Sequence, residues 1–509
     1  MSASFRRLSK NKTGKSGTLC LDRILYGAFG SIQRTLSNAK RMLCMNRILT
    51  GCLALAFLAT SAMTATAYEA FQGPLGLLQK KQGTYEGYTL LAPQNSKTTY
   101  LLDMDGKVVN EWKSDYSCFY AELLPNGNML RHSRLPDRNP EFGGAAGLLE
   151  EFDWNGKKVW EYKCYTPGKE VSHHTFEVMP NGNVLLLVWE YRSYEDAIAK
   201  GLDPNKRGRT LFRDGMKISN GYMCKGIWPD VIREVEHGTG KTVWEWKVWD
   251  HIGTTPDKID INAFCDLGNI MRALAGPDWT HLNGVAYNPA TNEIAFTSRN
   301  LGEVFIIDYK SDGGIKYRWG NPGNYGKGDL PWGYAKDGDQ RLWGPHAPDW
   351  TAEGTLSIMD NGCYRPSGNY TRAVELDPKK NAVVWQWTPK LAKAADSNFY
   401  SAFQNGAQKL PNGNWVITTS SPGHIIEVTK DHSIVWEYVN PVAKDKAYAL
   451  SNGHGGNGDS VHKAVRYGKD WPGFKGKDMS AKRDLMPAGS PNWLEVFSKC
   501  ETVPMPGAK

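Results

Sequence analysis

Four histidines stand at comparable distances from short turn sequences, and this spacing gives the first indication of chemistry. His173 and His174 come about one strand's length before MPNGN, His281 comes before NPATNE, and His346 comes before TAEGT. Asn-Gly and related turns between apolar runs are strong signals for a β-hairpin. Each of these histidines is therefore expected near the start of the first strand of a hairpin.

The hairpin geometry adds an arginine. Residues equidistant from a turn face each other across an antiparallel pair. His281 and Arg299 are symmetric about position 290, the centre of the NPATN turn, and the same construction places His346 opposite the neighbourhood of Asn361, close to Arg365. The expected result is a pocket of imidazoles with at least one guanidinium.

This set of side chains favours chemistry on an anionic group. Arginine grips an oxyanion such as sulfate or phosphate with two parallel N–H bonds, and histidine adds further donors. A neutral imidazole can also be a nucleophile that forms a covalent intermediate. The sequence has no H-E-x-x-H motif, so a metal hydrolase is not favoured, although three histidines could bind a metal. We expect group transfer without a metal or a cofactor.

The elements that position these residues follow from a pattern that occurs six times. It reads acidic residue, turn, Gly-Lys-like pair, β-branched residues and Trp-Glu-aromatic, as in DMDGKVVNEW (103–112) and DPKKNAVVWQW (377–387). Several copies follow an Asn-Gly turn such as LPNGN (124–128). Two hairpins make a four-stranded meander, and six meanders predict an all-β, six-bladed β-propeller with four antiparallel strands per blade. An array of β-sandwiches is the alternative.

The ring must be closed by the two ends of the chain. The first strand pair, 85–112, has no partner pair of its own, and the tail 440–509 contains the strand-like NWLEVF. We expect N- and C-terminal strands to complete one blade together. Long insertions between strands usually carry binding residues. Three such insertions are expected to shape one rim: 192–232, 247–278 and 320–342.

The N-terminal residues have the pattern of a secretory signal. Arg41 and Arg47 are followed by the apolar run 53–59 and by Ala65-Thr66-Ala67, which predicts cleavage before Tyr68 and a periplasmic protein with no membrane segment after cleavage. The predicted organisation is a leader at 1–67, a short segment at 68–84 and the propeller at 85–509.

Charge and cysteine content narrow the functional class. The formal net charge is +8, but residues 1–67 hold ten basic residues and one acidic residue, so the remainder, with 51 basic and 52 acidic residues, is nearly neutral. A nucleic-acid-binding surface is not expected. An exported protein can form disulfides, and six cysteines allow 15 complete pairings. The cysteines after the leader are Cys118, Cys164, Cys224, Cys265, Cys363 and Cys500.

Several motifs resemble the bacterial arylsulfate sulfotransferase family. They are DWTHLNGVAYNP with AFTSRNLGEVFIID (278–308), HHTFEVMPNGNVLLL (173–187) and GPHAPDW (344–350), and the similarity covers roughly 85–440. The resemblance implies an exported six-bladed propeller that moves a sulfuryl group from a phenolic sulfate donor to a phenol acceptor. It also implies a ping-pong cycle through a sulfohistidine, independent of phosphoadenosine phosphosulfate.

The resemblance also suggests residue roles. It makes His346 the nucleophile and makes His281 and Arg299 sulfate-binding residues, with one of His173 and His174 as the remaining histidine. Strand alternation allows only one of that pair to face the channel, and we favour His174. The residues expected to contact substrate are His173, Asn283, Asn361 and Arg365.

Other readings of the chain stay open at this stage. TGKTVW (239–244) resembles a docking motif of pyrroloquinoline-quinone propellers, so a quinone-dependent dehydrogenase-like enzyme is one alternative, and a non-enzymatic ligand-binding propeller is another. Some family members carry an N-terminal β-domain that supports dimerisation. Only 17 residues separate Tyr68 from Tyr85, so that domain is not expected here and the oligomeric state is open.

Overall fold

The structure is a computed structural model that describes the greater part of the chain after residue 74. The described residues are 75–94, 96–205, 213–217, 223–263, 277–331, 336–394, 399–443, 446–447, 460–486, 490, 492 and 495. They all belong to one compact unit, Glu69–Lys509. The predicted leader at 1–67 lies outside the described residues.

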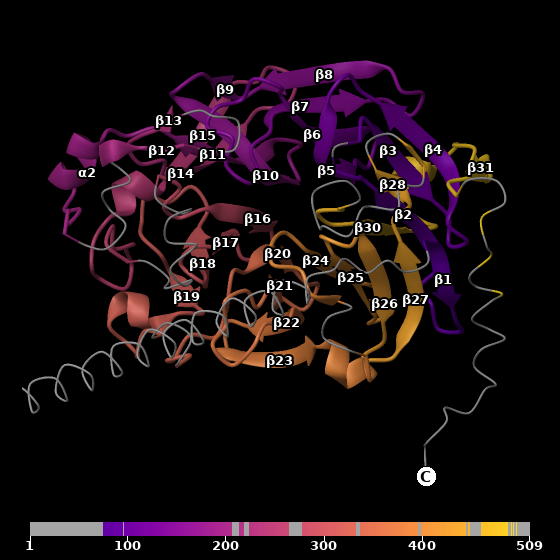
Figure 1. The fold of residues 1–509 in the computed structure, drawn as a ribbon. Coiled ribbons are helices and arrows are strands. Elements are labelled where there is room, and N and C mark those ends of the chain that lie inside the picture. Colours follow the sequence, from indigo (N-terminus) through magenta and orange to yellow (C-terminus); the bar gives the residue numbers. More distant parts are fainter. Residues whose placement is uncertain are drawn as a thin grey trace, which may run out of the picture. The chain divides into compact units, whose positions relative to one another are not determined.

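Six antiparallel sheets are arranged in a ring, which confirms the predicted all-β, six-bladed propeller (Figure 1). In each blade the innermost strand borders the centre of the ring. With the innermost strand first, the blades are: blade 1, β30 (Val465–Gly468), β2 (Gly87–Leu91), β3 (Thr98–Leu102) and β4 (Lys107–Lys113); blade 2, β5 (Ser117–Leu123), β6 (Met129–Arg134), β7 (Gly147–Phe152) and β8 (Lys158–Lys163); blade 3, β10 (Glu170–Val178), β11 (Val184–Glu190), β14 (Asp230–Val235) and β15 (Thr242–Lys247); blade 4, β16 (Leu282–Asn288), β17 (Glu293–Ser298), β18 (Glu303–Asp308) and β19 (Tyr317–Trp319); blade 5, β20 (His346–Trp350), β21 (Leu356–Asp360), β22 (Arg372–Asp377) and β23 (Ala382–Trp387); blade 6, β24 (Gly406–Lys409), β25 (Trp415–Thr419), β26 (His424–Val428) and β27 (Ile434–Val439).

The two ends of the chain close the ring in blade 1. Strand β30 from the tail pairs antiparallel with β2, with Gly87 opposite Gly468. The sequence predicted one strand pair from the N-terminal part. In the structure the N-terminal part supplies three strands of this blade, and the tail supplies the innermost one. The predicted tail strand 492–497 lies almost entirely outside the described residues. Two further strands extend sheets at their outer edges: β31 (Arg483–Asp484) beside β4, and β1 (Gly76–Lys80) beside β27.

The repeated turn sequences form because their polar side chains hold the backbone in a tight bend. Asp103 Oδ1 accepts hydrogen bonds from the backbone N–H groups of Asp105 and Lys107, each at 2.9 Å. In the Pro-Asn-Gly-Asn turn, Asn126 Oδ1 accepts the N–H of Asn128 at 2.9 Å. Such Asx turns compete well with other local structures, so both hairpins of a blade are specified locally.

The tryptophans of the repeat connect neighbouring blades. Trp112 of blade 1 donates its indole N–H to the Asp153 carbonyl of blade 2 at 2.8 Å, and Trp436 of blade 6 donates to the Met104 carbonyl of blade 1 at 3.0 Å. Both indole rings are buried in apolar clusters shared by adjacent blades. Buried aromatic rings contribute much apolar area and satisfy their polar group with a hydrogen bond, so these residues hold the ring together.

The insertions lie in connections that leave the sheets at the edge where the innermost strands begin. They include residues between β11 and β14, between β15 and β16, and between β19 and β20. The remaining elements are α2 (Tyr194–Ala199), β9 (Tyr165–Thr166), β12 (Met216–Lys217), β13 (Met223–Cys224), β28 (Val442–Ala443), β29 (Lys446–Ala447) and the 3-10 helices Val248–His251, Pro322–Tyr325, Pro389–Ala392 and Pro472–Phe474.

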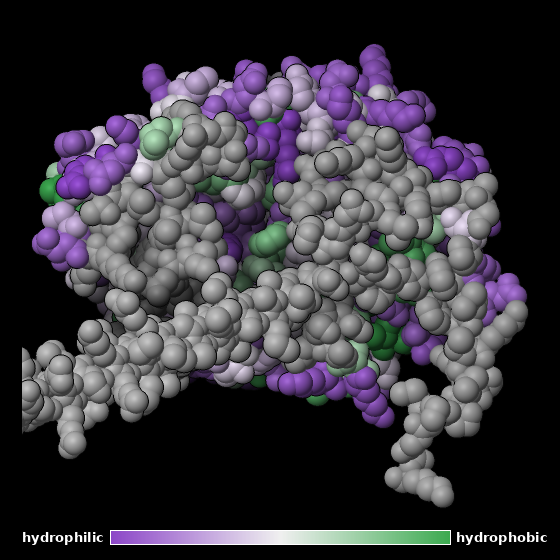
Figure 2. All heavy atoms as spheres, viewed as in Figure 1, coloured by the Kyte–Doolittle hydropathy of each residue, from purple (hydrophilic) through white to green (hydrophobic). Residues whose placement is uncertain are grey.

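The outer strand of blade 2 faces solvent. Strand β8 alternates between exposed and half-buried residues, and hydrophilic side chains cover this edge of the ring in the space-filling view (Figure 2). No helix among the described residues has the length and apolar character needed to cross a membrane.

Candidate functional site

Irregular backbone marks the innermost strands at the places where the predicted histidines lie. The pairing register slips once on each of β10, β16 and β20, at or beside the histidine. His174 and His281 have φ angles of 55° and 48°, and Ala347, which follows His346, has 47°. A positive φ costs a non-glycine residue about 1–3 kcal/mol. A bulge re-aims side chains, and here three adjacent blades carry the same device.

The re-aimed imidazoles meet. The ring centroid of His174 lies 4.7 Å from that of His281 and 6.2 Å from that of His346. Arg299 donates its backbone N–H to the His281 carbonyl at 3.1 Å, so the two residues are paired as the hairpin geometry predicts. The structure therefore brings these three histidines together at the centre of the ring and pairs Arg299 with one of them.

The hydrogen bonds of His346 define its tautomer. Its Nδ1 lies 2.9 Å from the Gly344 carbonyl and 2.9 Å from Asn361 Oδ1. Asn361 donates its own Nδ2 to the carbonyls of Ser401 and Gln404, which turns Oδ1 toward the imidazole. Two acceptors at Nδ1 require a proton there. The lone pair of His346 is consequently on Nε2.

His346 is also kept neutral. Burial lowers the pKa of His346 well below its usual value, and the charges of Arg299, His462 and His281 lower it further. Burial and the neighbouring imidazoles lower the pKa of His174 in the same way. These two rings are therefore uncharged at neutral pH.

The two adjacent histidines have different surroundings. His173 stacks on Trp189 with a centroid separation of 3.7 Å, and its Nε2 lies 3.1 Å from Asp230 Oδ1. His173 Nδ1 lies 2.9 Å from His174 Nδ1. His174 is the member of the pair that meets the other imidazoles. His173 lies behind it and fixes its ring.

His281 has an acidic partner that the sequence analysis did not single out. Its Nδ1 is hydrogen-bonded to the carboxylate of Asp278, three residues earlier in the DWTH sequence. A carboxylate on one ring nitrogen orients the imidazole and holds the proton on that side or between the two groups. The other nitrogen, Nε2, makes no hydrogen bond to the described part of the chain and is available to a ligand.

Two of the expected substrate contacts are occupied by the protein itself. Asn283 is buried and donates to the Pro345 carbonyl at 2.7 Å, which ties β16 to the residue before His346. Arg365 donates to Asp360 Oδ2 at 2.8 Å. Both residues hold the backbone around the site, and Asn361 does the same through the hydrogen bonds described above.

Arg299 differs from the nearby Arg365, whose guanidinium is paired with Asp360. Arg299 is 7% exposed, and its side chain donates to Asn300 Oδ1 at 3.3 Å. Among the described residues no acidic side chain forms an ion pair with it. An unpaired buried charge is costly, by several kcal/mol. The guanidinium beside neutral imidazoles therefore indicates a place for an anion.

Sequence reasoning missed two further histidines. His462 is 1% exposed, neither ring nitrogen has a hydrogen-bond partner, and its centroid lies 6.3 Å from that of His174. His132 bonds the His174 carbonyl and Ser172 Oγ, each at 2.8 Å. His462 lies shortly before β30, as His281 lies directly before β16. The tail sequence contains this histidine and the strand after it, but recognising their role required knowing which tail strand enters blade 1.

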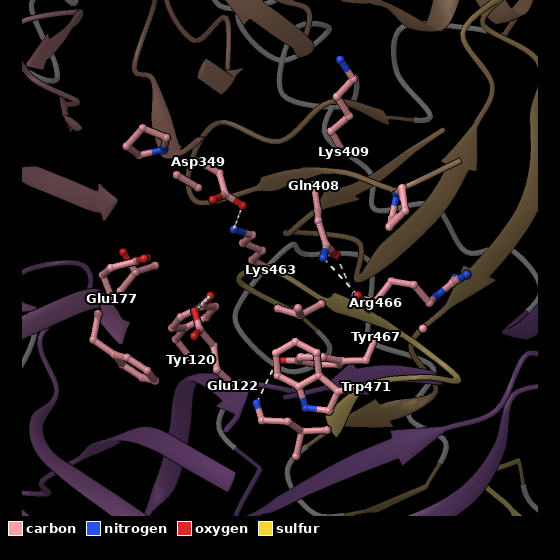
Figure 3. Close-up of a pocket in the computed structure, with 18 of the residues that line it drawn as sticks. Tyr120, Glu122, Glu177, Asp349, Gln408, Lys409, Lys463, Arg466, Tyr467 and Trp471 are labelled. Atoms are coloured by element: carbon pink, nitrogen blue, oxygen red, sulfur yellow. Dashed lines mark hydrogen bonds and ion pairs between the residues drawn. The ribbon is translucent and has the colours of Figure 1, made fainter. Parts of the chain in front are cut away.

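A cavity of about 470 Å³ lies in the channel on the turn side of the histidines (Figure 3). It begins at Thr175 and Ala347, the residues that follow His174 and His346 along their strands. Its walls combine aromatic side chains with charged and polar ones. The aromatic residues that line it are Tyr85, Tyr120, Phe176, Tyr467 and Trp471.

The cavity also contains charged groups. Lys463 Nζ lies 3.0 Å from Asp349 Oδ2, and Tyr120 donates to the carboxyl group of Glu122. Figure 3 shows these side chains and Glu177 pointing into the same space. Burial and the charge of Glu122 raise the pKa of Glu177 well above its usual value. The Glu177 carboxyl group therefore keeps its proton readily.

A family model matches the part of the chain that carries most of this site. The Arylsulfotransferase (ASST) model matches residues 203–452, which include His281, Arg299 and His346. Over these residues the chain is similar to the arylsulfotransferase family. The matched part contains the unpaired arginine and two of the three converging histidines.

Curated relatives agree with the family match. The chain is 22% identical over 395 residues to arylsulfate sulfotransferase AssT of Escherichia coli O6:H1, and 23% identical over 392 residues to AssT of Lelliottia amnigena. Each comparison covers 65% of this chain and 58% of the relative, so the chain spans less than two thirds of either protein. A solved structure of a protein of unknown function from Bacteroides caccae matches with a TM-score of 0.44 at 11% identity, over 75% of this chain and 98% of that one.

The described side chains form neither a metal site nor a disulfide. Within the described ranges, no group of three or more His, Cys, Asp or Glu side chains has a geometry that could hold a metal ion. The four cysteines in the described part of the chain are buried free thiols: Cys118, Cys164, Cys224 and Cys363. Cys265 and Cys500 lie outside the described residues.

Proposed function

We propose that the protein transfers a sulfuryl group from a phenolic sulfate ester to a phenol, through a covalent sulfohistidine on His346 and without phosphoadenosine phosphosulfate. The observation that carries this proposal is the buried, unpaired guanidinium of Arg299 beside neutral imidazoles. A site with that composition stabilises a group whose negative charge lies on several oxygens.

Three side chains would hold the sulfuryl oxygens. Arg299 offers a planar pair of N–H donors and His174 offers an imidazole N–H. His281 would offer an Nε2–H in its doubly protonated form, in which Nδ1–H donates to Asp278. Preorganised donors in a buried site stabilise charge that redistributes in the transition state, and each is typically worth about 3–4 kcal/mol. The strained φ angles of His174 and His281 fit such a role, because strain of this kind persists where the surrounding structure fixes a functional geometry.

The chemistry takes two balanced steps. In the first, His346 Nε2 attacks sulfur, an N–S bond forms, the S–O bond to the aryl oxygen breaks and a phenolate leaves. In the second, the oxygen of an acceptor phenol attacks sulfur, the N–S bond breaks and the acceptor loses its proton. Gly344 and Asn361 support both steps because they keep the proton of His346 on Nδ1.

The aromatic cavity is the natural place for the aryl group. Its volume of about 470 Å³ exceeds that of one phenol, and it begins at the residue after the proposed nucleophile. Aromatic walls favour a flat ring by stacking and edge contacts. Donor and acceptor phenols would use this space in turn, as a ping-pong cycle requires.

The test is the reaction with p-nitrophenyl sulfate, with and without phenol. We expect a burst of nitrophenolate without acceptor, continuous turnover with phenol, and sulfated phenol as product. Equal continuous hydrolysis in both reactions, with no sulfated phenol, would identify a sulfatase instead. A protein that binds aryl sulfates and releases no nitrophenolate would be a binding propeller.

We also infer that the protein is exported and acts in the periplasm, from the Arg-rich, apolar and Ala-x-Ala sequence at 41–67. N-terminal sequencing of active protein from the exported fraction should begin at Tyr68. Active exported protein that retains residues 1–67 would contradict this inference.

A further inference from the structure

In the proposed reaction, no residue has yet been assigned to the phenolic oxygen. Arg299, His281 and His174 account for the three sulfuryl oxygens, and His346 accounts for sulfur. The phenolic oxygen gains negative charge when it leaves, and as an acceptor it must lose a proton. None of the residues with a proposed role serves that oxygen.

His462 is a buried imidazole of this region with neither ring nitrogen bonded to the described protein. Both ring nitrogens lack a hydrogen bond, and the side chain is 1% exposed. Buried polar groups in folded proteins are nearly always satisfied, so an unsatisfied one calls for a ligand, a water or a catalytic role. A neutral imidazole that lacks partners on both sides can accept a proton at one nitrogen and donate at the other.

The position of His462 fits the phenolic oxygen. Its ring lies 6.3 Å from that of His174 and 5.8 Å from that of Tyr120, measured between centroids. Tyr120 and Lys463 line the aromatic cavity, and His174 belongs to the sulfuryl site. His462 therefore lies at the junction between the place for the sulfuryl group and the place for the aryl ring, where the oxygen that joins them must be.

We propose that His462 is the general base that removes the proton of the acceptor phenol. As the phenol oxygen attacks sulfur, its O–H proton passes to an unprotonated nitrogen of His462, the O–S bond forms and the N–S bond to His346 breaks. The resulting imidazolium then releases the proton to water. By microscopic reversibility, the protonated ring assists departure of a poorly leaving donor phenol.

The electrostatic surroundings keep this base unprotonated between turnovers. Burial lowers the pKa of His462 to about 3, and the charges of Lys463, Arg134 and His132 contribute. The titratable and charged groups around the ring, on its own segment and on β5, β6, β10 and β20, are Lys463, Tyr120, His132, Arg134, His174 and His346.

The proposal rests on the proposed sulfuryl transfer and is tested half-reaction by half-reaction. The sulfated enzyme is formed with p-nitrophenyl sulfate and then mixed with acceptor. In His462→Gln, the nitrophenolate burst should stay within about threefold of wild type, because nitrophenolate leaves without a proton. Discharge by phenol should be slower by roughly 10²- to 10⁴-fold, the usual contribution of a general base.

An internal comparison separates proton transfer from misfolding. A strongly acidic phenol that is already ionised at the assay pH needs no base, so the same variant should be discharged by it at a rate close to that of wild type. His432 is half-buried in the turn between β26 and β27, where Nε2 lies 2.9 Å from the Gln386 carbonyl; His432→Gln is the matched control and should behave as wild type with both acceptors. Equal loss with phenol and with the ionised phenol, or no loss with phenol, would overturn the role of His462.

Wild-type protein gives a test that needs no variant. Discharge by phenol through an internal base of low pKa should not change with pH between about 6 and 9, and it should slow in deuterated water. A rate that rises tenfold per pH unit would mean that free phenolate attacks, and His462 would have no such role. Absence of any nitrophenolate burst from wild type would instead reject the sulfuryl transfer itself.

Discussion

Replacement of Arg299 should change activity and stability in opposite directions. Arg299→Met removes a buried charge that has no ion-pair partner in the described structure. Replacing buried charges by apolar residues of similar volume is often stabilising by 1–4 kcal/mol, so we expect the free energy of unfolding to rise by about 1–3 kcal/mol. Most proteins lose stability on substitution in the interior, and a gain here would mark a residue kept for function.

Activity should fall in the same variant. Removal of one preorganised oxyanion donor costs about 3–4 kcal/mol, or 10²- to 10³-fold, and Arg299→Met removes a bidentate donor together with its charge. Arg299→Lys keeps the charge and loses the planar fork, so we expect a smaller loss of about 2–3 kcal/mol, roughly 30- to 200-fold. Nitrophenolate release from p-nitrophenyl sulfate measures both variants.

A paired arginine provides the control. The side chain of Arg318 is 5% exposed and donates through Nε and Nη2 to the carboxylate of Glu303, at 2.7 Å for each bond. Arg318→Met leaves that buried carboxylate with the Asn324 amide as its remaining partner, so it should destabilise the protein by about 3–5 kcal/mol. The contrast between the two arginines depends on pairing and not on burial.

Thermal unfolding with and without sodium sulfate completes the assay. Sulfate that binds the folded site of wild type should stabilise it by about 1.4 kcal/mol at ten times the dissociation constant, and Arg299→Met should lose that effect. If Arg299→Met is less stable than wild type, still responds to sulfate or retains activity, the interpretation of Arg299 as an anion-binding residue is wrong.

Three further outcomes follow from the contacts of the site. Asn361→Leu removes one of the two acceptors at His346 Nδ1, so we expect nucleophilic attack, measured as the nitrophenolate burst rate, to slow about tenfold while Gly344 still favours the same tautomer. Gly144→Ala places a methyl group 2.2–2.5 Å from ring atoms of His174 at a φ of +103°, so turnover should fall even where circular dichroism shows intact blades. His462 is neutral in the folded protein, with a pKa of about 3, and titrates near 6.5 when unfolded. Its contribution to stability is therefore complete above pH 6.5 and is lost as the pH falls toward 3, so between pH 6 and 4 the unfolding free energy of wild type should fall about 1.4 kcal/mol per pH unit more steeply than that of His462→Phe in denaturant titrations.

The repeats in the sequence were sufficient to predict the blades and part of the site. Asx turns, Asn-Gly turns and aromatic strand ends act within a few residues of one another, so each hairpin is specified locally. Because a hairpin also fixes which residues face each other, the pairing of His281 with Arg299 followed from counting residues about the turn.

Tertiary structure decided the features of the site that depend on contacts between different blades. The ring closes through β30, which places His462 of the tail beside His174 although 288 positions separate them in the sequence. Bulges on three inner strands, and not strand alternation alone, turn the imidazoles inward. The absence of an acidic partner for Arg299 among the described residues could be recognised only in the folded chain. An ion pair depends on distances between side chains of different blades, and local sequence patterns do not encode those distances.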